Sequence, residues 1–136
     1  MILIDLNVLL DVVQKREPHY RASATVLERI VHGETTGALP AHAVTTIHYI
    51  VGKYQDAATA DGAVDWLLRH FRTLPATHAD LMRARVLGWR DYEDAVVAAT
   101  AESAHCEAII TRNVKDFAGS PVPPLTPEEY LASVDE

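Results

Sequence analysis

Short apolar runs alternate along this chain with longer segments whose apolar residues recur every three or four positions. The runs Ile2–Ile4 and 107–111 are continuous and rich in β-branched residues, which predicts strands buried on both faces. Residues 36–41 predict a short second strand, and residues 72–75 predict an edge strand because Pro75 ends the run. Strands that alternate with helices are typical of a parallel sheet.

The segments with helical periodicity predict the covering layers of the fold. We expect helices over residues 8–14, 18–32, 44–54, 56 or 59 to 71, 77–87 and 91–104, and a short one from 126 or 127. Gly33 and Gly88 suit helix ends, and residues 112–117 predict a loop. No linker, repeat or charge run divides the chain. The sequence therefore predicts a single domain over residues 1–136, with a three-layer α/β/α fold, a mostly parallel sheet and helices on both faces.

Charge and composition narrow the function. The chain has 12 Lys and Arg against 19 Asp and Glu, a net charge of -7. This excludes a protein that holds nucleic acid by bulk charge alone, but not one that cuts it with a metal bound to carboxylates. A single Cys, no signal-peptide pattern and no apolar run near the ~20 residues of a membrane span predict a cytoplasmic protein without a membrane segment.

Acidic residues stand at the ends of the predicted elements. Asp5 follows the first strand, Asp91 and Asp94 open a helix, and Asp116 follows the last buried strand. The carboxyl ends of parallel strands share one edge of the sheet, where ligands bind. Carboxylates that converge there repel one another, and a hard cation such as Mg²⁺ or Mn²⁺ removes that repulsion. Because a metal-activated water can attack a phosphodiester, the pattern predicts metal-dependent hydrolysis of a phosphate ester.

Each of these acids also has a purely structural interpretation. Asp5 and Asp91 are good helix N-caps, Asp94 suits the first turn of a helix, and Asp116 suits a turn. The joint placement of the acids at one sheet edge is what favours a functional site.

Three sequence blocks together resemble the PIN domain family. They are Met-Ile-Leu-Ile-Asp-Leu-Asn-Val-Leu-Leu-Asp (1–11), Asp-Tyr-Glu-Asp-Ala-Val-Val-Ala-Ala-Thr-Ala (91–101) and Ile-Ile-Thr-Arg-Asn-Val-Lys-Asp-Phe (109–117). Within the family the chain is most similar to small single-domain VapC-type toxins. The resemblance implies a PIN-like fold and a Mg²⁺- or Mn²⁺-dependent endoribonuclease. It also implies a homodimer, an RNA substrate and an antitoxin protein as partner.

The resemblance also assigns roles to residues at matching positions. The catalytic acids match Asp5, Asp94 and Asp116; the metal ligands match these three and Asp91; the supporting polar positions match Asn7, Thr46, Thr111 and Asn113.

The helix after the second strand departs from the family pattern. The family commonly has an acid early in this helix, whereas this chain has Thr46 there and no Asp or Glu between Thr35 and Gln55. An alternative function is therefore a catalytically weak PIN-like module that binds RNA or protein. A phosphotransferase of the haloacid-dehalogenase type is disfavoured, because that class needs an acid where this chain has Asn7.

Two histidines lie near the same segment. His42 and His48 lack the spacing of a helical zinc pair, so we expect ordinary polar roles for them.

Overall fold

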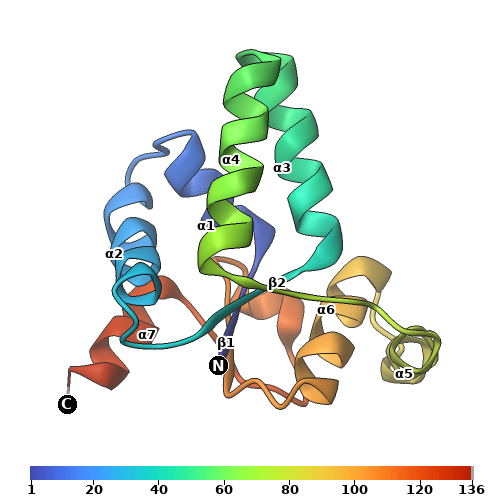
Figure 1. Ribbon diagram of the computed structural model, residues 1–136. Helices are drawn as coiled ribbons and strands as arrows, with labels where there is room; N and C mark the ends of the chain where they lie inside the picture. Colours follow the sequence, from blue (N-terminus) through green and yellow to red (C-terminus); the bar gives the residue numbers. More distant parts are fainter. Residues whose placement is uncertain (136) are drawn as a thin grey trace.

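A five-stranded parallel sheet forms the centre of the computed structural model, which describes residues 1–135 (Figure 1). The strand order is β3-β2-β1-β4-β5, so the first strand is central, as the sequence predicts. The strands are β1 (Ile2–Ile4), β2 (Gly37–Pro40), β3 (Arg72–Leu74), β4 (Ala108–Ile110) and β5 (Pro124–Leu125). The helices are α1 (Leu6–Val13), α2 (Tyr20–Val31), α3 (Ala41–Tyr54), α4 (Ala57–His70), α5 (His78–Leu87), α6 (Tyr92–Ser103) and α7 (Pro127–Val134), with a 3₁₀ helix η1 (Val114–Phe117).

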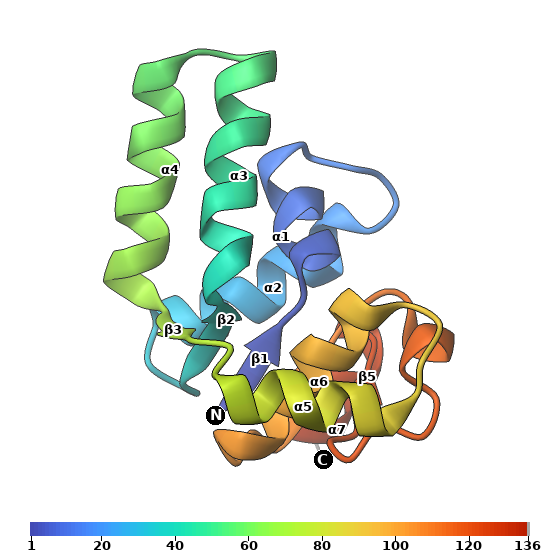
Figure 2. The same ribbon diagram turned by 90° about the vertical axis from the view of Figure 1, so that its right-hand side faces the viewer.

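The two faces of the sheet carry separate hydrophobic cores. In β1, the side chains of Ile2 and Ile4 pack on the face covered by α1, α2, α3, α4 and α7. Leu3 lies on the opposite face, against α6 and Phe117 of η1. Helix α5 packs on the outer side of α6 (Figure 2). This arrangement confirms the predicted α/β fold with helices on both faces.

Helices α3 and α4 form a hairpin that projects from the body of the molecule (Figures 1 and 2). Helix α3 begins directly after β2, and Ile47 and Val51 bury its inner side in the core. The hairpin therefore rises from the same edge of the sheet as the carboxyl end of β1.

Side-chain caps fix where most helices begin, as the sequence predicts for Asp5 and Asp91. Asp5, Asp56, Thr77, Asp91 and Thr126 each accept a hydrogen bond from a backbone N–H of the helix that follows. At Gly88 the backbone turns into the left-handed region with φ 67°, which ends α5.

The structure differs from the sequence-based expectation in short segments. Strand β5 was not predicted, because two residues, one of them proline, carry no periodic pattern. Residues 114–117 form a 3₁₀ helix instead of a loop. Helices α1 and α3 begin two and three residues earlier than their apolar periodicity indicates, and α2 begins two residues later. Within residues 1–135, no helix has the length and apolar character needed to cross a membrane.

Close packing of α2 against β2 yields a stability prediction. A Cβ atom on Gly37 would lie 2.6 Å from Ile30 Cδ1 and 3.0 Å from Phe71 Cδ1, whereas one on Gly62 would meet nothing within 4 Å. We expect Gly37→Ala to lower the free energy of unfolding by about 1–3 kcal/mol through overpacking. The matched helical change Gly62→Ala should raise it by about 0.5–1 kcal/mol. Urea denaturation measures both, and effects of the same sign would contradict this packing.

Candidate functional site

The carboxyl ends of β1 and β4 place Asp5 beside Thr111. The two strands pair in parallel with Ile4 opposite Ile110, and the Asp5 N–H donates to the Ile110 carbonyl at 2.9 Å. The Thr111 hydroxyl then donates to Asp5 Oδ2 at 2.8 Å. Asp5 Oδ1 accepts from the Leu6 N–H at 2.8 Å, so Asp5 caps α1 as well as facing the sheet edge. The Asp5 carboxylate is therefore fixed by one contact from each strand end.

Asn7 and Asn113 complete a hydrogen-bond network around the Thr111 hydroxyl oxygen. This oxygen accepts from Asn7 Nδ2 at 3.4 Å and from the Asn113 N–H at 3.1 Å. Asn7 Oδ1 accepts from the Arg112 N–H at 3.3 Å. Because the hydroxyl oxygen accepts these N–H groups, its own proton is directed to Asp5. The structure thus brings together three of the predicted supporting residues.

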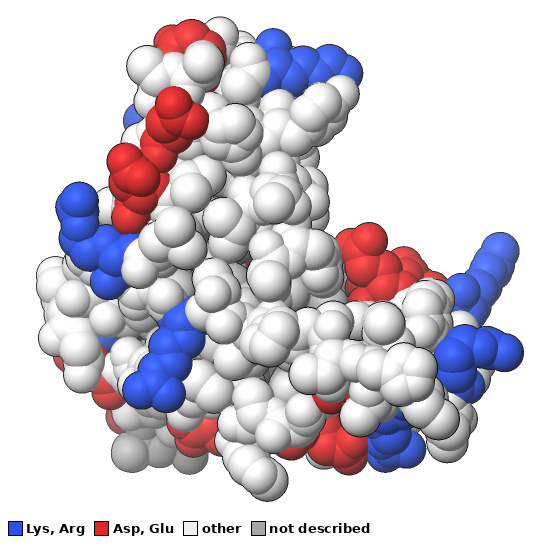
Figure 3. All heavy atoms as spheres, turned by 45° about the vertical axis from the view of Figure 1, so that its right-hand side comes forward, with Lys and Arg blue, Asp and Glu red and all other residues white. Residues whose placement is uncertain are grey.

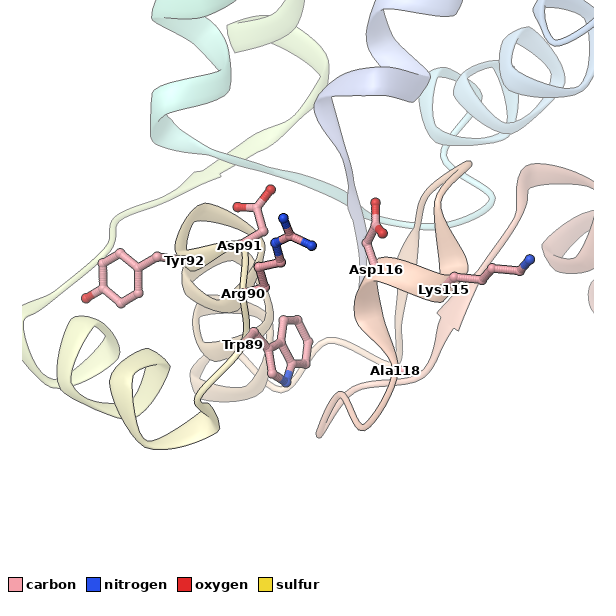
Figure 4. Close-up of a pocket in the computed structure, with 7 residues that line it drawn as sticks. All are labelled: Trp89, Arg90, Asp91, Tyr92, Lys115, Asp116 and Ala118. Atoms are coloured by element: carbon pink, nitrogen blue, oxygen red, sulfur yellow. The ribbon is translucent and has the colours of Figure 1, made fainter.

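Asp94 of α6 lies close enough to Asp5, Asp91 and Asp116 for their charges to act on it. Asp91 caps α6, and its Oδ1 accepts from the Asp94 N–H at 3.1 Å. Burial is the main reason that the pKa of Asp94 is raised to about 7, followed by the negative charges of Asp91, Asp5 and Asp116. Figure 4 shows the carboxylates of Asp91 and Asp116 directed to the same side of the site.

Burial also raises the pKa of Asp5. The hydrogen bonds from Thr111 and Leu6 oppose this rise, and the charge of Glu93 adds to it. Glu93 in turn faces His42 of α3, with 3.7 Å between His42 Nε2 and Glu93 Oε1. Glu93 and His42 therefore lie next to the site, although the sequence pattern did not assign either residue to it. His48 lies away from this group and pairs with Asp61.

Thr46 stands where the family commonly has an acid, but its side chain does not take the place of a carboxylate. It is half-buried on α3, and its hydroxyl donates to the His42 carbonyl at 3.0 Å. The hydroxyl proton is thus engaged by the helix backbone.

A buried ion pair holds the segment that follows β4 against α1. Asp11 of α1 is fully buried, and its Oδ2 lies 2.8 Å from Arg112 Nε and 3.3 Å from the Ser23 hydroxyl, which donates to it. Asp11 falls in the first of the three PIN-like sequence blocks, but no local pattern assigns it this role, because its partner Arg112 lies far away along the chain. The pair ties α1 to the loop that begins at Thr111.

An open pocket lies between Asp91 and Asp116. A pocket of about 710 Å³ is lined by Trp89, Arg90, Asp91, Tyr92, Lys115, Asp116 and Ala118 (Figure 4). Figure 3 shows acidic side chains gathered in the hollow at the foot of the α3–α4 hairpin.

The acids suit a hard divalent cation. Within residues 1–135, no group of three His, Cys, Asp or Glu side chains is already arranged around a single metal position. Mg²⁺, however, is commonly held by one or two carboxylates together with water molecules. The carboxylates of Asp5, Asp91 and Asp116 act electrostatically on Asp94 and offer only oxygen ligands, so this group fits such an ion.

Comparison with known proteins identifies the fold family. A family model described as the PIN domain matches residues 1–115. The chain belongs to the PIN domain family. The match covers Asp5, Asp91 and Asp94 and ends one residue before Asp116. A comparison with curated proteins gives no match.

Solved structures share this PIN fold over nearly the whole chain. A toxin-antitoxin complex from Klebsiella pneumoniae is 26% identical with a TM-score of 0.72, and the match covers 93% of this chain and 98% of that one. VapBC2 from Rickettsia felis, bound to a DNA fragment from its promoter, is 17% identical with a TM-score of 0.72. The match again covers 93% of this chain and 98% of that one.

A third relative in fold is VapC20 from Mycobacterium tuberculosis, described as a sarcin-ricin loop cleaving toxin. It is 12% identical with a TM-score of 0.68, and the match covers 88% of this chain and 96% of that one. These findings confirm the resemblance to PIN domains and to VapC-type structures. The roles assigned to the site residues remain predictions.

The ion pair of this PIN domain predicts a large effect of one substitution. Arg112→Ala leaves the Asp11 carboxylate buried without its cation, which should lower the free energy of unfolding by about 3 kcal/mol or more. Arg83→Ala breaks the exposed pair with Glu102 and should cost much less. Urea denaturation of both variants tests the difference. Similar losses would show that water screens the Asp11 charge.

The raised pKa of Asp94 predicts a pH dependence of stability in metal-free protein. Between the ordinary carboxyl pKa of 3.8 and about 7, the native state keeps this proton while the unfolded chain has lost it. The free energy of unfolding should therefore fall as pH rises through this window. Asp94→Asn removes that contribution. Thermal denaturation in EDTA across the window measures it, and a pH profile that Asp94→Asn leaves unaltered would contradict the placement of this acid.

Proposed function

We propose that this protein is a metal-dependent endoribonuclease and the toxin of a toxin–antitoxin pair. The observation that carries the proposal is the electrostatic coupling of Asp94 to Asp5, Asp91 and Asp116, which are drawn from three separate parts of the chain. Clustered carboxylates oppose folding, so their convergence needs a functional reason. A divalent cation on the carboxylates provides one.

Each acid has a part in this proposal. Asp5, Asp94 and Asp116 would hold Mg²⁺ or Mn²⁺, with Asp91 as an additional ligand at the rim. A bound divalent cation supplies charge neutralisation of the phosphodiester and a water of lowered pKa. Thr111 favours the ionised form of Asp5 and orients the carboxylate by donating to its Oδ2. Because the pKa of Asp94 is about 7, this acid gives up a proton when it becomes a ligand near neutral pH.

Protein partners form the second half of the proposal. The solved structure from Klebsiella pneumoniae that this chain resembles is a toxin-antitoxin complex. Large apolar side chains are exposed on this chain, among them Tyr49 and Leu68 on the hairpin and Met82 and Val86 on α5. We propose that an antitoxin and a second copy of the chain cover such surfaces, and that the protein acts on cytoplasmic RNA.

Thr46 favours a second candidate function. A PIN domain with one acid fewer should bind its cation more weakly. The Thr46 hydroxyl does not compensate, because it donates its hydrogen bond to the His42 carbonyl. The alternative is a module that binds RNA or a protein without cutting RNA.

A nuclease assay separates the two candidates. Purified protein should cleave RNA in Mg²⁺ or Mn²⁺ and not in EDTA. Asp5→Asn should lower the rate by about 100-fold or more, because it removes a proposed ligand. RNA binding without metal-dependent cleavage would instead establish the binding module.

The Thr46 position yields a gain-of-affinity prediction. Thr46→Glu adds a negative charge where the family commonly has an acid, so Mn²⁺ should bind about ten-fold more tightly. Thr45→Glu is the matched control, because Thr45 is exposed and its hydroxyl donates to the same His42 carbonyl.

Calorimetric titration with Mn²⁺ decides the outcome. If Thr46→Glu changes nothing while Asp5→Asn abolishes binding, the metal site stands and the missing acid belongs elsewhere. If neither substitution alters the titration, this edge of the sheet holds no cation.

A further inference from the structure

A separate pocket of about 390 Å³ lies at the edge of the sheet opposite the acids. Ile2 and Ala108 line it at the amino ends of β1 and β4, whereas Asp5 and Thr111 follow the carboxyl ends of the same strands. Residues of α2 and α7 complete the lining, and in Figure 1 α7 and the N-terminus lie at the end of the molecule opposite the α3–α4 hairpin. The volume is in the range of small-molecule sites, and a ligand here would leave the acids free.

Tyr130 of α7 brings an unpaired hydroxyl to this pocket. The residue is only 7% exposed, and it belongs to the hydrophobic core that also contains Ile2 and Ala108. Its hydroxyl forms no hydrogen bond with any residue from 1 to 135, because the neighbouring Ser133 hydroxyl donates to the Tyr130 backbone carbonyl instead, at 2.7 Å. A buried tyrosine usually has a partner for its hydroxyl. The unpaired hydroxyl therefore indicates that an acceptor from outside these residues binds in the pocket.

Arg29 of α2 adds a guanidinium with little to bind. Its side chain is 25% exposed, and its Nε is buried without a hydrogen-bond partner among the described residues. Its Nη1 lies 3.7 Å from Glu34 Oε2, which is an ion contact but too long for a hydrogen bond. A guanidinium has five N–H donors, and donors that are withdrawn from water without acceptors cost free energy. The pocket thus presents several donors and calls for a ligand rich in acceptors.

We propose that this pocket binds the carboxylate of a small organic acid with a short hydrocarbon chain. The carboxylate accepts hydrogen bonds from the terminal N–H groups of Arg29 and from the Tyr130 hydroxyl, while the hydrocarbon chain packs against Leu125 and Val134. Glu34 already places one negative charge beside Arg29, so a singly charged carboxylate is repelled less than a doubly charged phosphate. The proposal is independent of the ribonuclease function, since the ligand contacts none of the proposed metal ligands.

An NMR titration with 4-methylpentanoate tests the proposal directly. The backbone amide resonances of Ile2, Ala108 and Val134 should shift saturably, with half-saturation at about 1 mM or below, as expected for a well-bound ligand of this size. The matched neutral compound is 4-methylpentanamide, which keeps the hydrocarbon chain and lacks the charge. It should bind about tenfold more weakly or worse, because charge-assisted hydrogen bonds are lost.

Two substitutions remove the two donors separately. Arg29→Gln should weaken the binding of 4-methylpentanoate by about tenfold or more, and Tyr130→Phe should weaken it by about 5- to 10-fold while keeping the ring. Arg21→Gln is the matched control, because Arg21 is exposed on the same helix and does not line the pocket. Tyr130→Phe should not lower the melting temperature of the ligand-free protein, since its hydroxyl has no partner to lose. This readout separates a loss of the ligand contact from a loss of the fold.

Glu34→Gln tests the argument from charge. It removes the negative charge that competes with the ligand for Arg29, so 4-methylpentanoate should bind about 2- to 5-fold more tightly. Inorganic phosphate should bind the wild-type protein more weakly than 4-methylpentanoate does at the same pH and ionic strength.

The results that would overturn the proposal are distinct from one another. Equal affinity for the acid and the amide, or wild-type affinity in both Arg29→Gln and Tyr130→Phe, overturns the carboxylate contact. Phosphate binding as tight as that of 4-methylpentanoate overturns the assignment to an organic acid. Absence of saturable shifts at millimolar concentrations overturns the pocket as a binding site. None of these results depends on whether the protein cleaves RNA.

Discussion

The hydrogen bond from the Thr111 hydroxyl to Asp5 Oδ2 joins the ends of two neighbouring strands, and the candidate site is built around it. It forms because β1 and β4 pair in parallel with Ile4 opposite Ile110, in a sheet buried on both faces. From Asp5 the chain enters α1, and from Thr111 it continues into η1, which carries Asp116. A change in register between these strands would therefore separate the acids as well as expose the core.

Carboxylates also repel one another at this same edge of the sheet. Burial and neighbouring carboxylates raise the pKa of Asp94 to about 7, so part of the site is neutral without a cation. Beneath it, Asp11 and Arg112 form a buried ion pair that holds the loop after β4. Such pairs contribute little net stability but are costly to break, so this one acts mainly as a constraint on the geometry of the loop.

The features that are local in sequence could be predicted before the structure. The buried strand Ile2–Ile4, the cap at Asp91 and the end of α5 at Gly88 each depend on a few adjacent residues. The ion pair between Asp11 and Arg112 and the contact of Trp89 with Phe117 could not, because their partners are separated by stretches of chain whose packing no periodic pattern encodes. Strand β5 is too short to leave a pattern. The joint position of the acids was predictable only because parallel strands collect their carboxyl ends at one edge.

Anomalous diffraction from crystals grown with Mn²⁺ tests the central claim most directly. The account predicts one strong peak within coordination distance of carboxylate oxygens of Asp5 and at least one of Asp94 and Asp116, which should vanish in Asp5→Asn crystals. A peak elsewhere, or Asp5 and Asp94 carboxylates separated by more than about 10 Å, would contradict a shared metal site.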